Sequence, residues 1–96
     1  MRIRSFWHKG LKRLYETGDH RGVPAQYVAK VTDIIHAMEQ ARSLTQIGLF
    51  PGWRVHRLKG KRRSDWSVWV TGNFRITFQV AGDEVWDIDF EDYHGK

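Results

Sequence analysis

Apolar side chains in the first half of the chain recur every three or four residues, which is the spacing of one face of an α-helix. A first helix is predicted over residues 9–18, with Gly18 as its stop, and Pro24 fits the first turn of a second helix that continues to about Ala41. We expect the second helix to pack its apolar stripe against a sheet, because a small chain needs that area in its core. The apolar positions are Leu11, Leu14 and Tyr15 in the first helix and Tyr27, Val28, Val31, Ile34, Ile35 and Met38 in the second.

A period of two replaces the helical spacing after Trp53 and predicts β-strands. Gly72 and Asn73 are a two-residue signal for a tight hairpin, and Gly82 with Asp83 marks the next turn. Residues 44–52 contain two glycines and a proline and are predicted to be a connection. The predicted strands are residues 54–58, 66–71, 74–80 and 86–91, together with a short N-terminal strand at residues 2–7.

This order of elements predicts an α+β fold, in which an N-terminal strand and two helices pack on a mostly antiparallel sheet of about four to five strands. The length of 96 residues predicts a single domain, residues 1–96, and a hydrophobic content of 41% argues against a disordered chain. The sequence has no cysteine, which excludes disulfides, cysteine-based zinc sites and thiol nucleophiles. No export signal or apolar stretch of membrane-spanning length is recognisable, so we expect a cytoplasmic protein with no membrane partner.

Positive charge is concentrated in one segment of the chain. The formal net charge is +5, from 16 Lys and Arg against 11 Asp and Glu, and six of the acidic residues lie within residues 83–96. Residues 54–63 hold six Lys and Arg in ten positions, together with His56. Such a run suits a polyphosphate such as RNA, and a solvated loop that keeps the protein soluble is an equally good interpretation. The six cations are Arg54, Arg57, Lys59, Lys61, Arg62 and Arg63.

Two clusters of side chains are candidates for chemistry. If the second and last strands end at the same edge of the sheet, both clusters converge on one groove, to which Arg75 on the polar face adds a cation. Cleavage of RNA through its own 2′-hydroxyl needs a proton acceptor, a proton donor and cations for the phosphate, but no metal. The residue types present meet that need. The clusters are His56 with Lys59, beside the basic run, and Asp92, Tyr93 and His94 near the C-terminus.

Simpler interpretations apply to the same residues. A histidine near a strand end is more often a surface residue than a catalyst, and Arg75 could simply pair with an aspartate of the last strand. His56 and Lys59 are three residues apart, so on a straight strand their side chains point to opposite faces. They converge only if the strand ends by Leu58 or if the chain bends at Gly60.

Four ordered motifs, spread from Ile3 to His94, are similar to those of a known protein family. On these residues the chain resembles the HigB toxins of the RelE/ParE superfamily. Two departures are visible: Phe74 stands where the family often has tryptophan, and Gly95 and Lys96 extend beyond the usual terminal histidine. The motifs are Ile3-Arg4-Ser5-Phe6 with Lys9-Gly10-Leu11-Lys12, Val55-His56-Arg57-Leu58-Lys59-Gly60, Trp66-Ser67-Val68 with Asn73-Phe74-Arg75-Ile76-Thr77-Phe78, and Glu91-Asp92-Tyr93-His94.

The resemblance implies a RelE-like fold and the toxin half of a bacterial type II toxin-antitoxin pair. The implied activity is that of a ribosome-dependent endoribonuclease, or mRNA interferase, which cuts mRNA codons in the ribosomal A site by metal-independent attack of the 2′-hydroxyl and so stops translation. The implied partners are a HigA-like helix-turn-helix antitoxin, the 70S ribosome with its rRNA, and mRNA. Operator DNA would be bound only through the antitoxin complex, and no cofactor or metal is implied.

The resemblance also implies roles for individual residues. His56 or His94 would transfer protons, Lys59 and Arg75 would be cations for the phosphate, and Tyr93 would stack on or orient a base. The remaining residues would support these groups or contact ribosomal RNA: Asp92 in the first role, and Arg54, Arg57, Lys61, Arg62 and Arg63, with the basic N-terminal helix, in the second.

Two alternatives stay open. The first is a non-catalytic toxin on the same scaffold that binds a protein target such as DNA gyrase, in the manner of ParE relatives. The second is an RNA-binding module without chemistry, for which only the basic run matters. A pure binder of either kind does not need His56, Lys59, Tyr93 and His94.

Overall fold

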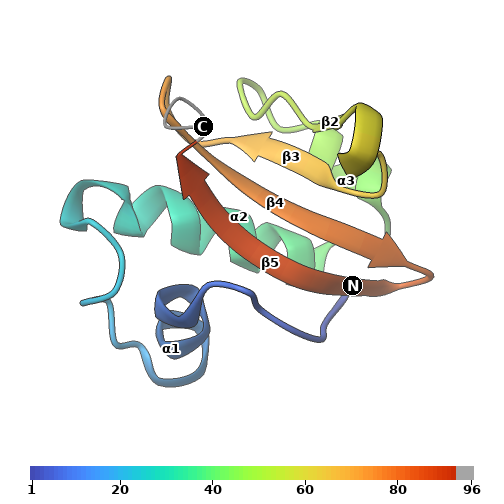
Figure 1. The fold of residues 1–96 in the computed structure, drawn as a ribbon. Helices are drawn as coiled ribbons and strands as arrows, with labels where there is room; N and C mark the ends of the chain where they lie inside the picture. Colours follow the sequence, from blue (N-terminus) through green and yellow to red (C-terminus); the bar gives the residue numbers. More distant parts are fainter. Residues whose placement is uncertain (93–96) are drawn as a thin grey trace.

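A five-stranded sheet carries the two long helices on one of its faces in the computed structural model, which describes residues 1–92 (Figure 1). The strand order is β1-β5-β4-β3-β2, in which β1 runs parallel to β5 and the other neighbours are antiparallel. Within the described range no helix is long and apolar enough to cross a membrane. The elements are β1 (Arg2–Ile3), α1 (Lys9–Thr17), the 3-10 turn η1 (Ala25–Tyr27), α2 (Val28–Gln40), α3 (Leu44–Gly48), β2 (His56–Arg57), the 3-10 turn η2 (Gly60–Arg62), β3 (Trp66–Trp69), β4 (Phe74–Ala81) and β5 (Glu84–Asp92).

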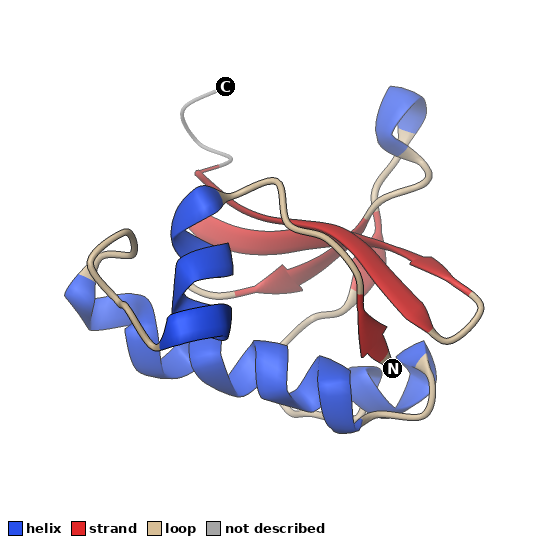
Figure 2. Cartoon of the chain, turned by 90° about the horizontal axis from the view of Figure 1, so that it is seen from below, coloured by secondary structure: helices blue, strands red, loops and turns tan. Residues whose placement is uncertain are grey.

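The two faces of the sheet differ in polarity. Val68 of β3 and Ile76 of β4 are cross-strand neighbours, and both are fully buried beneath the helices. Figure 2 shows α1 and α2 together on one side of the sheet. The adjacent row is Ser67, Thr77 and Asp89, and alternation along each strand directs these side chains to the opposite side. We call this second side the open face.

The predicted α+β class, with helices on a mostly antiparallel sheet, is confirmed, as are both predicted helices. The side chain of His8 caps the start of α1, because its Nδ1 accepts a hydrogen bond from the backbone N–H of Leu11. Gly18 ends α1 in the left-handed conformation, with a φ of 79°. The buried stripe of α2 consists of Val31, Ile34, Ile35 and Met38.

Several local predictions are wrong. Residues 44–48 form α3 instead of a connection, and the fully buried Ile47 anchors this helix. The strands predicted at residues 2–7 and 54–58 shorten to two residues each. The β3–β4 hairpin is present, but its loop spans residues 70–73, and neither Gly72 nor Asn73 has the positive φ that the predicted two-residue turn needs.

Candidate functional site

The open face brings together polar side chains from four strands. Arg75 of β4 and Glu91 of β5 are register partners, and Trp69 lies opposite Arg75 on β3. In the adjacent row, His56 of β2 is the register partner of Ser67. Cross-strand partners point to the same side, so His56 and Arg75 share the open face, with β3 between their strands.

His56 is exposed, and its ring is oriented by the backbone. Its Nδ1 lies 2.8 Å from the carbonyl oxygen of Arg54. Because a carbonyl oxygen only accepts, Nδ1 donates in this contact and Nε2 of the neutral ring keeps a lone pair. Arg54 has a φ of 49°, in the left-handed region that residues other than glycine seldom occupy. An imidazole held in this way is able to accept a proton from a substrate hydroxyl.

Lys59 lies just beyond the strand that carries His56. β2 ends at Arg57, and Gly60, with a φ of 67°, turns the chain into η2. Both alternatives stated for the convergence of His56 and Lys59 are therefore met: the strand ends by Leu58, and the chain turns at Gly60. Lys59 is exposed, and its direction is set by the turn instead of by strand alternation.

Glu91 is the centre of a hydrogen-bonded network on the open face. Arg75 donates to Oε1 of Glu91 from Nε at 3.1 Å and from Nη2 at 2.9 Å. Arg62 of η2 donates from Nη1 to Oε1 and from Nη2 to Oε2, both at 2.8 Å, and the hydroxyl of Thr77 donates to Oε2 at 2.9 Å. These hydrogen bonds, chiefly those from Arg62, lower the pKa of Glu91 from 4.5 to about 2.

Sequence reasoning did not identify Glu91 as a partner of Arg75. The signal available was the alternation of β5, which puts Glu91 on the polar face with Asp89. The contact with Arg62 had no local signal, because it joins residues that are 29 positions apart. It depends on how the segment after β2 folds back over the sheet.

The basic run divides into tethered and solvent-facing cations. The guanidinium of Arg54 lies over the ring of Trp69 at 5.3 Å, and that of Arg57 lies over Trp66 at 5.6 Å. Arg62 is bound to Glu91 and, through Nε, to Asp65. The exposed members of the run that follow β2 include Lys59, Lys61 and Arg63.

The C-terminal cluster is only partly described. Asp92 ends β5, directly after Glu91, and is the register partner of Phe74. Phe74 stacks on Phe90 with ring centroids 4.9 Å apart, so its side chain packs on the helix side of the sheet. Position 74 is the one at which the resemblance led us to expect tryptophan. Tyr93 and His94 lie outside the described residues, and their convergence with His56 stays a prediction.

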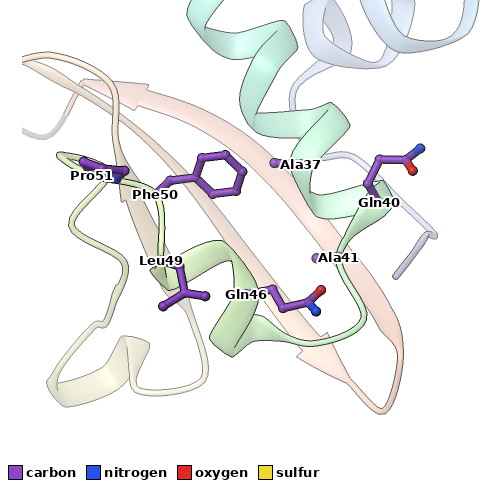
Figure 3. A pocket seen from close by; sticks show the side chains of 7 residues that line it. All are labelled: Ala37, Gln40, Ala41, Gln46, Leu49, Phe50 and Pro51. Atoms are coloured by element: carbon purple, nitrogen blue, oxygen red, sulfur yellow. The ribbon is translucent and has the colours of Figure 1, made fainter.

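Two hollows were not predicted from the sequence. A polar hollow of about 220 Å³ lies on the open face, and one of its lining residues, Trp7, is 72% exposed. An apolar groove of about 410 Å³ lies between the end of α2 and α3 (Figure 3). Residues 1–92 contain no group of three acidic or histidine side chains that could hold a metal ion. The polar hollow is lined by Trp7, Arg62, Asp65, Thr77, Asp87 and Asp89, and the groove by Ala37, Gln40, Ala41, Gln46, Leu49, Phe50 and Pro51.

Comparisons with known proteins agree on a family. A model of HigB-like toxins, described as RelE-like toxins of the type II toxin-antitoxin system HigB, matches residues 4–94. Endoribonuclease HigB of Proteus vulgaris is 41% identical over 92 residues, which cover 96% of this chain and 99% of that protein. A YoeB/ParE toxin from Agrobacterium tumefaciens has the same fold, with a TM-score of 0.62 and 17% identity over 96% of this chain and 98% of its own. A copper-bound mutant toxin from Helicobacter pylori has a TM-score of 0.57 and 14% identity over 99% and 97% of the two chains.

Proposed function

The chain belongs to the HigB-like toxins of type II toxin-antitoxin systems, and from this premise we propose that it is a ribosome-dependent endoribonuclease that cuts mRNA in the ribosomal A site. A type II toxin has an antitoxin partner, which we propose is HigA-like with a helix-turn-helix domain. Operator DNA would be bound only through that complex. Ribosomes and mRNA are the proposed targets, so the proposed place of action is the cytoplasm.

The observation that carries this proposal is the exposed His56, which lies within the basic run and whose Nδ1 contacts the backbone carbonyl oxygen of Arg54. In the proposed reaction Nε2 of His56 takes the proton of the 2′-hydroxyl, and the 2′-oxygen attacks the adjacent phosphorus. The bond to the 5′-oxygen breaks, and His94 protonates that oxygen as it leaves. The products are a 2′,3′-cyclic phosphate and a free 5′-hydroxyl.

The other residues of the site supply charge and position. Lys59 and Arg75 are the proposed cations for the negative charge that develops on the phosphate oxygens. Tyr93 would stack on a base of the single-stranded message, and Asp92, whose register partner Phe74 packs on the helix side, would support His94. The cations of the basic run and of α1 would contact ribosomal RNA, where they release counterions.

The test is 5′-end mapping of a defined message in a reconstituted translation system, with and without ribosomes. Wild type is compared with His94→Gln and with a control, His36→Gln, whose side chain is exposed on α2. We expect cuts within the A-site codon that require ribosomes and are lost in His94→Gln but not in His36→Gln.

Other results would contradict the proposal in different ways. An intact message with retained growth inhibition would favour a protein target such as gyrase, with DNA damage as the expected sign. Salt-sensitive ribosome binding without cut ends would indicate an RNA-binding module that has no chemistry.

A further inference from the structure

We propose that Glu91 is a positioning residue of the catalytic face, which holds Arg75 in place and fastens the segment that carries Lys59 to the sheet. This inference rests on the proposed function, because it assigns a role within the same site. Glu91 acts through Arg75 and Arg62, and it does not itself touch the RNA.

The hydrogen bonds of Glu91 exclude a role in proton transfer. Its carboxylate accepts five hydrogen bonds, four from the two guanidinium groups and one from Thr77. A carboxylate offers about four lone-pair positions, so none is left for a substrate proton. The side chain is 11% exposed, which also limits contact with a ligand.

The same geometry explains how two cations come to lie close together. Arg62 and Arg75 both contact Oε1 of Glu91, at 2.8 and 2.9 Å. Their positive charges repel each other, and the carboxylate between them offsets that repulsion. Without the charge of Glu91 we expect the Nη1 and Nη2 groups of Arg62 to leave the sheet while its Nε stays on Asp65, because the side chain is already 42% exposed.

The network joins three parts of the proposed site. Arg75 comes from β4, Glu91 directly precedes Asp92 on β5, and Arg62 follows Lys59 by three residues in η2. A cation that is fixed before the substrate arrives needs no reorganisation when charge develops on the phosphate. The Glu91 carboxylate therefore fixes the position of the Arg75 guanidinium and, through Arg62, the position of the segment that carries Lys59.

The experiment compares the steady-state cleavage of message on ribosomes by wild type, Glu91→Gln and Glu84→Gln. Glu84 is the matched control, because it lies on the same strand and pairs with Arg4, 3.6 Å away, at the far end. We expect kcat to fall roughly 10- to 100-fold in Glu91→Gln and to stay unchanged in Glu84→Gln. A purely structural role would lower the thermal midpoint and leave the kcat of the folded protein unchanged.

A double-mutant cycle tests whether Glu91 acts through Arg75. In an Arg75→Ala background, Glu91→Gln should lower kcat by a smaller factor than it does in wild type, because only the contact with Arg62 is then left to lose. Fully multiplicative losses would overturn the inference. If Glu91→Gln does not fold, Arg62→Gln provides a second variant at a more exposed site. For Arg62→Gln we expect a raised KM and a smaller loss in kcat than for Glu91→Gln. Wild-type kinetics in Arg62→Gln would contradict the inference.

The outcomes separate this inference from the proposed function. If wild type leaves the message intact, the proposed function fails and the role given to Glu91 fails with it. If wild type cuts and folded Glu91→Gln cuts equally fast, the proposed function stands and only the inference about Glu91 is wrong.

Discussion

Two glycines, Gly10 and Gly22, allow two backbone segments to pack in direct contact. A Cβ added to Gly10 of α1 would lie 2.5 Å from the carbonyl oxygen of Gly22, and a Cβ on Gly22 would lie 2.6 Å from the Cα of Gly10. We predict that Gly10→Ala lowers the free energy of unfolding by about 1–3 kcal/mol, because backbone must move to admit the methyl group. The measurement is urea unfolding. Gly48→Ala is the control, since nothing lies within 4 Å of its added Cβ, and an equal effect in both variants would refute the explanation.

The sequence allowed single residues to be assigned to a face, but it did not reveal their partners. The position of Arg75 on the polar face follows from the alternation of β4, and its pairing with Glu91 requires the register of β5. The motif similarity included Glu91 but assigned it no role. The network also contains Arg62, and no repeating pattern in the sequence connects Arg62 with Glu91. Side-chain contacts over long sequence separations depend on packing, which local patterns do not encode.

The short helix α3 depends on its one fully buried side chain. In α3, Ile47 is fully buried, whereas the following Leu49 is 75% exposed. We predict that Ile47→Ala lowers the free energy of unfolding by about 2–5 kcal/mol, through lost burial and the cavity left behind. Leu49→Ser should change it by less than about 0.5 kcal/mol, as for other surface substitutions. Chemical denaturation of both variants checks this, and a Leu49→Ser effect as large as that of Ile47→Ala would show that the exposed side chain also carries stability.

At the level of elements, periodicity was a good guide where elements are long. α2 and β4 repeat their apolar positions over several turns or residue pairs, and both were predicted almost to their ends. α3, β1 and β2 have five residues or fewer, too few to display a period. The prediction of a connection rested on the glycines and the proline after residue 47, whereas the structure docks this segment on the core through Ile47 and Leu44.

Over the whole molecule, the net charge of +5 predicts salt-dependent binding of RNA. The plot of log binding constant against log salt should lose roughly 0.7 in slope for each phosphate-contacting cation removed from a single-stranded probe. We therefore expect Lys61→Gln with Arg63→Gln to reduce the slope by about 1.4, measured by fluorescence anisotropy. Arg21→Gln is the control, because Arg21 pairs with Asp19. An unchanged slope in the double variant would show that these two exposed cations do not contact phosphate.

The position of β5 in the sheet determines when the fold can be completed during synthesis. β5 is the last element described, yet it lies between β1 and β4, and its register pairs Arg2 with Glu84. Synthesis delivers the N-terminal residues first, so β1 must wait for β5 before it has a neighbour. The row that contains Arg75 and Glu91 is likewise incomplete until then. The proposed site is therefore not assembled while the chain is still being synthesised, and we expect the toxin to become active only after β5 has left the ribosome.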